Sequence, residues 1–544
     1  MQILSGTIID PIARKTFGAR LVISDTGHIQ QIEPEMNPDP GYLLPGFVDS
    51  HVHIESSMLT PAAFAQAAIR QGTLAAVADP HEIANVLGKD GVILMIELAR
   101  QTPFVFGFGA PSCVPATPFE TSGATLDAAG VEQLMQLPEI THLSEVMNYP
   151  GILNNDSVLC QKIACAQRVG KPIDGHAPLL TGNGLRKYAA SGITTDHECV
   201  TVDEAREKIA LGMTVQIRHG SAARLNDSFL PLIAEYPEQC MFCSDDIHPD
   251  DLLLSYINVI ASRALAAGIS IYNVLWASSV NPVRHYKLPI GLLQAGDSAD
   301  FQRVDDLTRL MPTEVWLRGK CVFKNGQCDL PRGNPIVLNH FEAQPVTPSA
   351  FEVFAQPLDL LRVIQVHDGQ LITHALRMTP LLSHDQAVAD ISRDVLYIAV
   401  INRYQSAKPA VGFIQGFGLQ CGAIASSVAH DSHNIVAVGV TLHVLASAVN
   451  QVIANKGGLA VVDADGTALA TLPLPIAGLI SSEDAETVAH AYCACDTAAK
   501  VLGCTLHAPF MTLSFMALPV IPELKLTDRG LFDVTTFTHV PLCV

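Results

Sequence analysis

Alternation of apolar and polar side chains runs through the first part of the chain and predicts short β-strands with one buried face. Residues 2–10 (QILSGTIID) and 19–34 (ARLVISDTGHIQQIEP) show it, and Asp25-Thr26-Gly27 supplies a turn. The same alternation returns at 314–328 (EVWLRGKCVFKNGQC), where Asn325-Gly326 predicts a tight hairpin. The pattern therefore predicts β structure on both sides of a long middle region.

The middle region has a different pattern, in which short apolar runs alternate with segments of helical length. Two of those segments, 61–72 (PAAFAQAAIRQG) and 201–213 (TVDEAREKIALGM), have apolar residues at helical spacing. Eight strand-helix units in about 250 residues are typical of a (β/α)8 barrel. A doubly wound open sheet is the alternative, although none of the strands is followed by a Gly-rich dinucleotide-binding turn. The expected strands are GFVDSHVHI, TLAAVADP, FVFGFG, THLSEVM, KPIDGHA, ITTDHE, TVQIRHG and QCMFCSDD.

Three domains follow from these patterns, and the length of 544 residues is too great for a single ordinary core. We expect residues 1–42 plus 291–339 to form a composite β-sandwich domain. Residues 43–290 are expected to form the barrel. Residues 340–544 mix strand-like runs (VLYIAVI, NIVAVGV, GLAVVDAD) with Gly-rich turns, which predicts a separate α/β or α+β domain.

The charge balance narrows the classes of partner. The chain has 33 basic and 53 acidic residues, a formal net charge of -20. Such a charge repels nucleic acid and anionic membrane surfaces, so we expect a small-molecule partner. The least charged stretch, 431–456, contains interspersed His and Asn residues, and a buried helix or strand pair explains it better than a membrane span.

The N-terminal residues and the cysteines predict a cytoplasmic enzyme. No basic region followed by a long apolar run begins the chain, so we expect no signal peptide. The 13 cysteines are then expected to be reduced thiols. Cys240 and Cys243 form a single CxxC, which we interpret as part of a buried strand rather than a metal or redox motif.

The strongest chemical signal is Asp49-Ser50-His51-Val52-His53 in the first barrel strand. Residues two apart in a strand face the same side, so His51 and His53 point together and can hold one divalent metal. Two histidines on a strand are usually only partly buried side chains, so the interpretation requires ligands on other strands.

Further ligands occur at the ends of later strands, in order along the chain. Glu145 ends the fourth, His176 the fifth, His197 the sixth and Asp245 the eighth. A barrel brings these strand ends to one face, where its loops form the active site. Six ligands of imidazole and carboxylate type are enough for two metal ions that share a bridging group.

These residues and several longer motifs identify a family. PGFVDSHVHIESS and the later ligands resemble the amidohydrolase superfamily, and the resemblance is closest to bacterial adenine deaminases. ADPHEIANVLG, SEVMNYPGIL, DGHAPLLTGNGL, CSDDIHPDDL and the C-terminal IPELKLTDRGLFDV are similar to that family's motifs. The similarity covers nearly the whole chain, including the last block, which many other amidohydrolases lack.

The resemblance implies a metal-dependent hydrolase that converts adenine to hypoxanthine and ammonia in purine salvage or catabolism. It implies two divalent metal ions, with manganese or iron favoured and zinc also compatible with the ligands. Glu145 would take the place of the carboxylated lysine that bridges the metals in related cyclic-amide hydrolases. We expect a homo-oligomer. The alternative is another amidohydrolase that acts on a different nucleobase or opens a cyclic amide. A third hypothesis is a non-catalytic protein that has kept the barrel as a scaffold.

The expected reaction needs two proton-transferring groups. Asp245 is the candidate that accepts a proton from the attacking water and passes it to the leaving ammonia. Glu82, in DPHEI after the second strand, is the candidate acid that protonates a ring nitrogen. Its alternative role is to cap a helix that begins near Asn85.

Other polar residues at the same barrel face are candidates for substrate binding, although such side chains at least as often only hold neighbouring residues in place. Glu198 could hold its neighbour His197 in place. The C-terminal HDSHN segment, residues 430–434, could bind a metal or the substrate, but we interpret it as a polar turn packed between domains. The candidates for substrate binding are His81, His219, Asp246 and His248.

Overall fold

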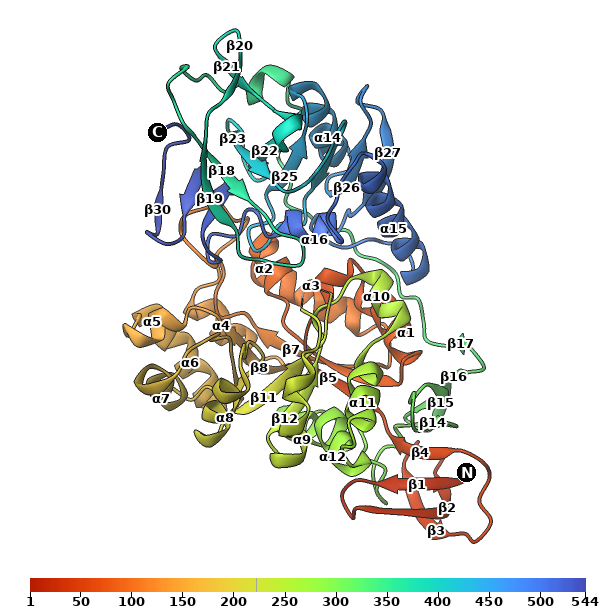
Figure 1. Cartoon of the computed structure of the whole chain (residues 1–544). Coiled ribbons are helices and arrows are strands. Elements are labelled where there is room, and N and C mark those ends of the chain that lie inside the picture. Colours follow the sequence, from red (N-terminus) through yellow and green to blue (C-terminus); the bar gives the residue numbers. More distant parts are fainter. Residues whose placement is uncertain (222) are drawn as a thin grey trace. The chain divides into compact units, whose positions relative to one another are not determined.

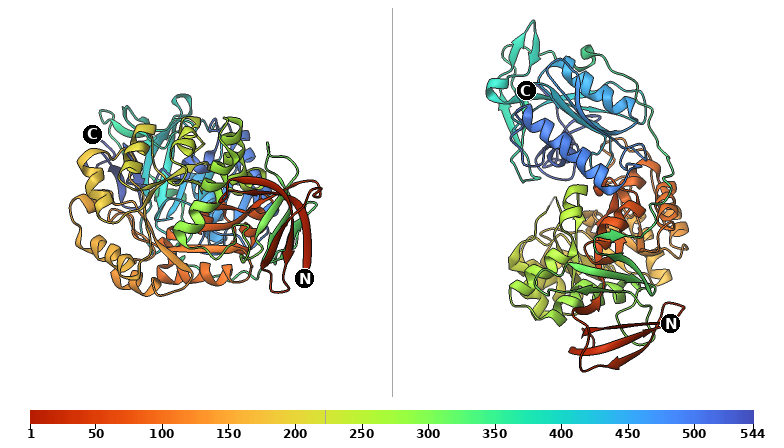
Figure 2. Two further views of the ribbon diagram at one scale, coloured as in Figure 1. Left: turned by 90° about the horizontal axis from the view of Figure 1, so that it is seen from below. Right: turned by 90° about the vertical axis from the view of Figure 1, so that its right-hand side faces the viewer.

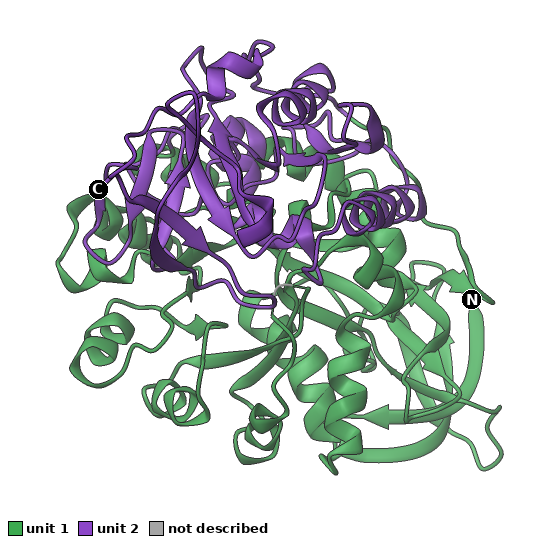
Figure 3. Cartoon of the chain, turned by 45° about the horizontal axis from the view of Figure 1, so that its top comes forward, with its two compact units in different colours: residues 1–81, 92–113, 126–335 green, residues 82–91, 114–125, 336–544 purple. Residues whose placement is uncertain are grey.

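A computed structural model describes residues 1–221 and 223–544. The chain divides into two compact units (Figure 3). The first unit is Met1–His81, Val92–Cys113 and Leu126–Pro335, and the second is Glu82–Gly91, Val114–Thr125 and Ile336–Val544. Two segments from the range expected for the barrel therefore group with the C-terminal residues. They follow the second and third barrel strands, as βα-loops of this fold do.

Strands from both flanks of the first unit join one hydrogen-bonded sheet, in the order β17-β16-β15-β14-β4-β1-β2-β3. In Figure 2 the red N-terminal strands lie beside green strands from beyond residue 300. Buried side chains from both flanks, including Ile8, Leu21, Phe301 and Trp316, form its core. The strands are β1 (Gln2–Asp10), β2 (Lys15–Ile23), β3 (Ile29–Pro34), β4 (Tyr42–Pro45), β14 (Phe301–Val304), β15 (Pro312–Leu317), β16 (Lys320–Lys324) and β17 (Gln327–Cys328).

The predicted Asn-Gly hairpin is confirmed between β16 and β17. Asn325 has φ +52° and Gly326 has φ +81°. Two successive residues in the left-handed region form the turn whose twist matches that of paired strands.

All eight strands expected in the middle region are present; β5 to β9 pair in parallel in chain order, and so do β10 to β12. Figure 1 labels β5, β7, β8, β11 and β12 among them. Six strands form one sheet, β13-β5-β6-β7-β8-β9, and three form another, β10-β11-β12. β9 lies next to β10 and β12 next to β5, as expected for an amidohydrolase barrel. The strands are β5 (Phe47–His53), β6 (Thr73–Ala78), β7 (Val105–Ala110), β8 (Ile140–Val146), β9 (Ile173–Gly175), β10 (Thr195–Asp196), β11 (Thr214–Arg218), β12 (Cys240–Cys243) and β13 (Asp245–Asp246).

Local sequence explains these elements. Every residue of β5 and β6 is buried, as in a parallel strand covered on both faces. The hydroxyls of Thr60 and Thr201 accept from backbone N–H groups and cap the two predicted helices, α1 and α8. The helices are α1 (Pro61–Ile69), α2 (His81–Leu87), α3 (Lys89–Ala99), α4 (Ala128–Leu134), α5 (Tyr149–Leu153), α6 (Ser157–Val169), α7 (Gly182–Ala190), α8 (Val202–Ala210), α9 (Pro231–Glu235), α10 (Pro249–Leu254), α11 (Ile257–Ala266), α12 (Ile271–Leu275) and α13 (Asn281–Tyr286).

The second unit contains a mostly antiparallel eight-stranded sheet, β19-β18-β23-β22-β25-β24-β26-β27, so the α+β alternative describes it. The helices α14 (Leu442–Ala454), α15 (Ala485–Val501) and α16 (Pro509–Ser514) pack against it. The strands, with two small sheets, are β18 (Leu361–Gln365), β19 (His374–Met378), β20 (Leu381–Ser383), β21 (Gln386–Val388), β22 (Val395–Ile401), β23 (Ala410–Gln415), β24 (Ala423–Ser426), β25 (Ile435–Gly439), β26 (Gly458–Val462), β27 (Ala468–Pro473), β28 (Leu524–Thr527), β29 (Gly530–Asp533) and β30 (Thr538–His539).

The uncharged stretch 431–456 forms strand β25 and helix α14, which confirms that it is a buried strand-helix pair. Among the described residues, no helix has the length and apolar character needed to cross a bilayer. Cys240 and Cys243 lie buried in β12 as free thiols, as expected for a strand.

Candidate metal centre

Three of the predicted ligands meet at the end of β5 and the start of β13 in the first unit. The Nε2 atoms of His51 and His53 are 3.3 Å apart. The Oδ1 atom of Asp245 lies 3.0 Å from Nε2 of His53 and 3.6 Å from Nε2 of His51. All three side chains are buried, so three atoms that can donate lone pairs converge away from water.

Glu145, in β8, places its two carboxylate oxygens against two different sets of histidines. Its Oε1 atom lies 3.4 Å from Nε2 of His53. Its Oε2 atom lies 2.5 Å from Nδ1 of His176 and 3.4 Å from Nε2 of His197. One oxygen therefore faces the His51–His53–Asp245 group and the other faces the His176–His197 pair.

The donor set is one that could hold divalent cations. The residues form buried groups of three or more ligands within 4.8 Å of one another, and Glu145 links the groups around His51 and His197. If two cations were bound here, Glu145 would be able to offer each of them one carboxylate oxygen. Mixed imidazole and carboxylate ligands suit manganese, ferrous iron or zinc.

The electrostatics of the cluster favour ionised carboxylates. Burial raises the pKa of Glu145, but the nearby His176 and His197 outweigh it and hold the pKa well below its usual range. Burial also raises the pKa of Asp245, but Arg218, His51 and His53 outweigh it and hold this pKa well below its usual range. The carboxylates are therefore in the form that binds cations.

Sequence reasoning missed Arg218 at the end of β11. Its Nη1 atom donates to Oδ2 of Asp245 at 2.6 Å and also to Glu198. Asp245 has φ +63°, a left-handed conformation that is uncommon outside glycine and often occurs at functional sites. Arg218 thus holds the outer oxygen of Asp245 while the inner oxygen faces the histidines. Glu198 belongs to this ion pair, as a supporting residue.

A second missed residue is Lys208 in helix α8, which is completely buried. Its Nζ atom lies 3.0 Å from Oδ2 of Asp196 and donates to Glu204 at 2.8 Å. It also donates to the backbone oxygen of Ala177 at 2.8 Å, while Asp196 accepts from the N–H of Ala177 at 3.0 Å. Because Ala177 follows His176 and Asp196 precedes His197, this network ties two ligand-bearing strand ends together.

Two of the candidate substrate-binding residues lie close to the cluster. Nδ1 of His81 is 3.5 Å from Oε1 of Glu145, and its ring is 4.6 Å from that of His53. Asp246 is buried and accepts a hydrogen bond from Ser56 at 2.5 Å.

The other two candidates make structural contacts. Nδ1 of His219 accepts from the N–H of Leu225 at 2.9 Å, and burial lowers the pKa of His219 to about 4. The backbone N–H of His248 donates to the hydroxyl of Ser221 at 2.9 Å. The His219 ring therefore helps to hold the loop that follows β11, while the contact of His248 is made by its backbone.

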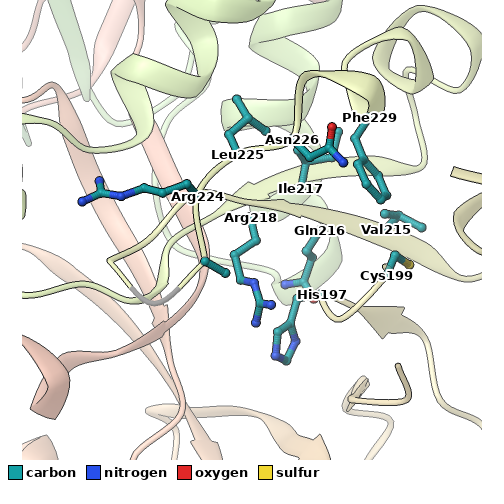
Figure 4. Close-up of a pocket in the computed structure, with 11 residues that line it drawn as sticks. His197, Cys199, Val215, Gln216, Ile217, Arg218, Arg224, Leu225, Asn226 and Phe229 are labelled. Atoms are coloured by element: carbon teal, nitrogen blue, oxygen red, sulfur yellow. The ribbon is translucent and has the colours of Figure 1, made fainter. Parts of the chain in front are cut away.

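A pocket lies beside this cluster, and its wall includes His197 and Arg218 (Figure 4). Its lining combines apolar and hydrogen-bonding side chains, as small-molecule sites do. The lining residues are His197, Cys199, Val215, Gln216, Ile217, Arg218, Ala223, Arg224, Leu225, Asn226 and Phe229.

Glu82 belongs to the second unit and lies in the first turn of α2. That helix begins at His81 and not near Asn85, so the expected start of the helix is wrong by four residues. The carboxyl group of Glu82 contacts two histidines of the HDSHN segment: Oε1 contacts Nδ1 of His430, and Oε2 lies 2.5 Å from Nε2 of His433. These contacts give the segment more than the role of a polar turn.

Comparison with known proteins supports the family predicted from the motifs. Residues 42–328 match the Amidohydrolase family, and residues 370–538 match the Adenine deaminase C-terminal domain. An adenine deaminase of Parabacteroides distasonis is 48% identical, with 100% of this chain and 99% of the relative covered. One of Salinibacter ruber is 50% identical, with 99% of this chain and 98% of the relative covered.

The resemblance is not confined to bacteria, so the expectation of a specifically bacterial family is not confirmed. The adenine deaminase of the archaeon Methanosarcina mazei is 44% identical, with 100% of this chain and 99% of the relative covered. Likeness at this level over the whole length shows the family. The chain belongs to the amidohydrolase family and, within it, to the adenine deaminases.

Proposed function

We propose that this chain hydrolyses adenine to hypoxanthine and ammonia with two divalent cations held in the first unit. The observation that carries the proposal is the placement of Glu145, whose two oxygens face two separate sets of histidines. Full-length similarity to adenine deaminases supports the substrate. The proposed ligands are His51, His53, Glu145, His176, His197 and Asp245.

Manganese or ferrous iron is the proposed metal, and zinc is compatible with the same ligands. Cations bound at these residues supply Lewis acidity, which lowers the pKa of water and makes a nucleophile available at neutral pH. The protein positions that water and moves its protons.

Proton balance defines the roles of the side chains. The oxygen of water adds to the ring carbon that carries the amino group, and the carbon–nitrogen bond to that group breaks. One proton of water leaves with ammonia, and the ring nitrogen beside this carbon gains another. Asp245 is the proposed carrier of the first proton, because Oδ1 faces the ligand cluster while Arg218 holds Oδ2 in place.

Glu82 is the proposed acid for the ring nitrogen. It directly follows His81, and a peptide bond keeps consecutive Cα atoms about 3.8 Å apart. His81 itself lies beside Glu145 in the first unit. The proton that Glu82 gives up is replaced by the second proton of the water. His81, Asp246, His219 and His248 are proposed to shape the substrate site.

A substrate panel tests the proposal. Metal-loaded protein is mixed with adenine, cytosine, guanine and a dihydropyrimidine, and the ultraviolet absorbance is followed. We expect turnover of adenine, with a spectrum that changes to that of hypoxanthine. Turnover of another base or of the cyclic amide in place of adenine would support the alternative amidohydrolase and contradict the proposed substrate.

A further inference from the structure

The carboxyl group of Glu82 is held by two histidines of the second unit, and all three side chains are buried. Oε1 contacts Nδ1 of His430, and Oε2 lies 2.5 Å from Nε2 of His433. Both histidines come from the C-terminal segment 430–434, far along the chain from Glu82. Each carboxyl oxygen therefore has its own imidazole partner.

The hydrogen bonding of His433 determines where its proton lies. The backbone N–H of Ala429 donates to Nδ1 of His433 at 3.1 Å, so Nδ1 carries a lone pair. Burial lowers the pKa of His433 to about 4, which leaves the ring neutral at neutral pH. Its single proton is then on Nε2, and Nε2–H donates to Oε2 of Glu82.

This tautomer excludes His433 as a metal ligand in this state. An imidazole nitrogen that carries a proton has no lone pair for a cation, so Nε2 of His433 cannot be a ligand in this state. The contact is instead a hydrogen bond to one defined oxygen. The acid role proposed for Glu82 requires a protonated carboxyl group, and because Oε2 accepts the bond from His433, that role places the proton on Oε1, beside Nδ1 of His430.

The backbone around the two histidines is built to hold their rings. The ring of His430 stacks on Phe515, with centroids 4.5 Å apart. His433 has φ +55°, a left-handed conformation that costs energy for a residue with a side chain. Its N–H donates to the oxygen of Ala429 at 2.7 Å, and the hydroxyl of Tyr404 donates to the oxygen of Ser432 at 2.5 Å.

We propose that His430 and His433 are positioning residues for Glu82, which select Oε1 as the oxygen that delivers a proton to the purine. The proposal rests on the acid role of Glu82 given above. Within the second unit, the segment 430–434 supplies both imidazole partners of Glu82.

The step balances without a co-reactant. The bond between Oε1 and its proton breaks, and a bond between that proton and the ring nitrogen forms. Glu82 becomes a carboxylate, whose Oε2 keeps the bond from His433. The proton lost from Oε1 returns from the water whose oxygen adds to the ring carbon.

Paired amide substitutions test the proposal, because glutamine places its amide near the position of Nε2 and asparagine near that of Nδ1. At position 433 the needed donor is Nε2–H, so His433→Gln should retain much of kcat and His433→Asn should lose about 10-fold to 100-fold. At position 430 the needed atom is Nδ1, so His430→Asn should outperform His430→Gln. The matched control is His490→Asn, an exposed histidine of the same unit.

Each variant is measured on the metal-loaded full chain for kcat, KM, metal content and Tm. Each is also combined with Glu82→Gln. We expect a higher kcat in His433→Gln than in His433→Asn and a higher kcat in His430→Asn than in His430→Gln, with normal metal content. Adding a histidine variant to Glu82→Gln should cause no further loss of kcat. If the two histidines only stabilised the fold, all four variants would have a lower Tm, and the opposite preference for Asn or Gln at the two positions would not appear in kcat.

Three results would overturn the inference. The histidine variants could keep wild-type kcat while Glu82→Gln loses activity, which leaves the acid role standing and removes the positioning role. Losses that multiply in the Glu82→Gln background would show that the histidines act independently of Glu82. Normal kcat in Glu82→Gln alone would remove the acid role itself, and the inference with it.

Discussion

Nδ1 of His176 lies 2.5 Å from Oε2 of Glu145, while the other oxygen of this carboxylate faces a different histidine. Glu145 thereby lies between His53 at the end of the first barrel strand and His176 after the fifth. A single carboxylate in this position determines whether the ligands form one joint centre or two separate ones.

Replacement of Glu145 by glutamine tests that connection. The amide keeps the shape but has only one oxygen and no charge, so it cannot bridge two cations. We expect Glu145→Gln to lose at least one equivalent of metal and about 100-fold or more in kcat, as analysis by plasma emission and adenine turnover would show. Glu139→Gln is the matched control, because the side chain of Glu139, just before β8, forms an ion pair with the exposed Arg100. This variant should change neither the metal content nor kcat.

Asp245→Asn separates proton transfer from coordination. Asparagine retains an oxygen for a metal but cannot accept a proton, so some metal should stay bound. Loss of general acid–base catalysis predicts that kcat falls by about 10²–10⁴-fold or more. Near-normal kcat in this variant would exclude Asp245 as the proton carrier, and Asp203→Asn on the exposed face of α8 serves as the control.

Lys208→Met tests the network beneath His176 and His197. Removing the cation leaves Asp196 and Glu204 buried without it, a change that typically costs about 3–5 kcal/mol of stability. We expect a lower Tm and weaker metal retention, because Asp196 also holds the N–H of Ala177. Unchanged Tm and metal retention would contradict the positioning role, and the exposed Lys187→Met is the control.

His142, in β8, gives a prediction for pH dependence. Burial lowers its pKa to about 3, whereas the unfolded value is 6.5, so the unfolded state binds the proton more readily. Stability from this group is therefore present above pH 6.5 and is lost as the pH falls from 6.5 toward 3. At pH 5 the loss is about 2 kcal/mol relative to pH 8.

The measurement compares Tm at pH 8 and pH 5 in metal-free protein. His142→Gln should show a smaller fall in Tm than the wild type, because glutamine does not titrate. An equal fall in both proteins would mean that other groups control the acid sensitivity. His490→Gln is the exposed control and should behave like the wild type.

The fold and the convergence of the candidate ligands could be predicted from the sequence because both depend on local patterns. A parallel strand buried on both faces is a continuous apolar run, and ligands at its end follow directly in the sequence. The HxH pair at His51 and His53 needs only the two-residue period of a strand. All eight predicted barrel strands are present, and the six predicted ligands converge.

Long-range contacts were not predictable in the same way. Lys208 has the position of an ordinary helical lysine, and only the fold shows that its side chain is buried between Asp196 and Glu204. Arg218 lies on a predicted strand, but no local pattern links it to Asp245. The partners of Glu82 are separated from it by 348 and 351 residues, and no period connects such positions.

The stoichiometry of metal in active protein tests the central claim most directly. Metal-free protein is titrated with Mn²⁺, and bound metal and kcat for adenine are measured at each step. The proposed centre predicts that full activity requires two equivalents per chain and that Glu145→Gln does not reach this value. Full adenine turnover with one equivalent, or with none, would contradict the account.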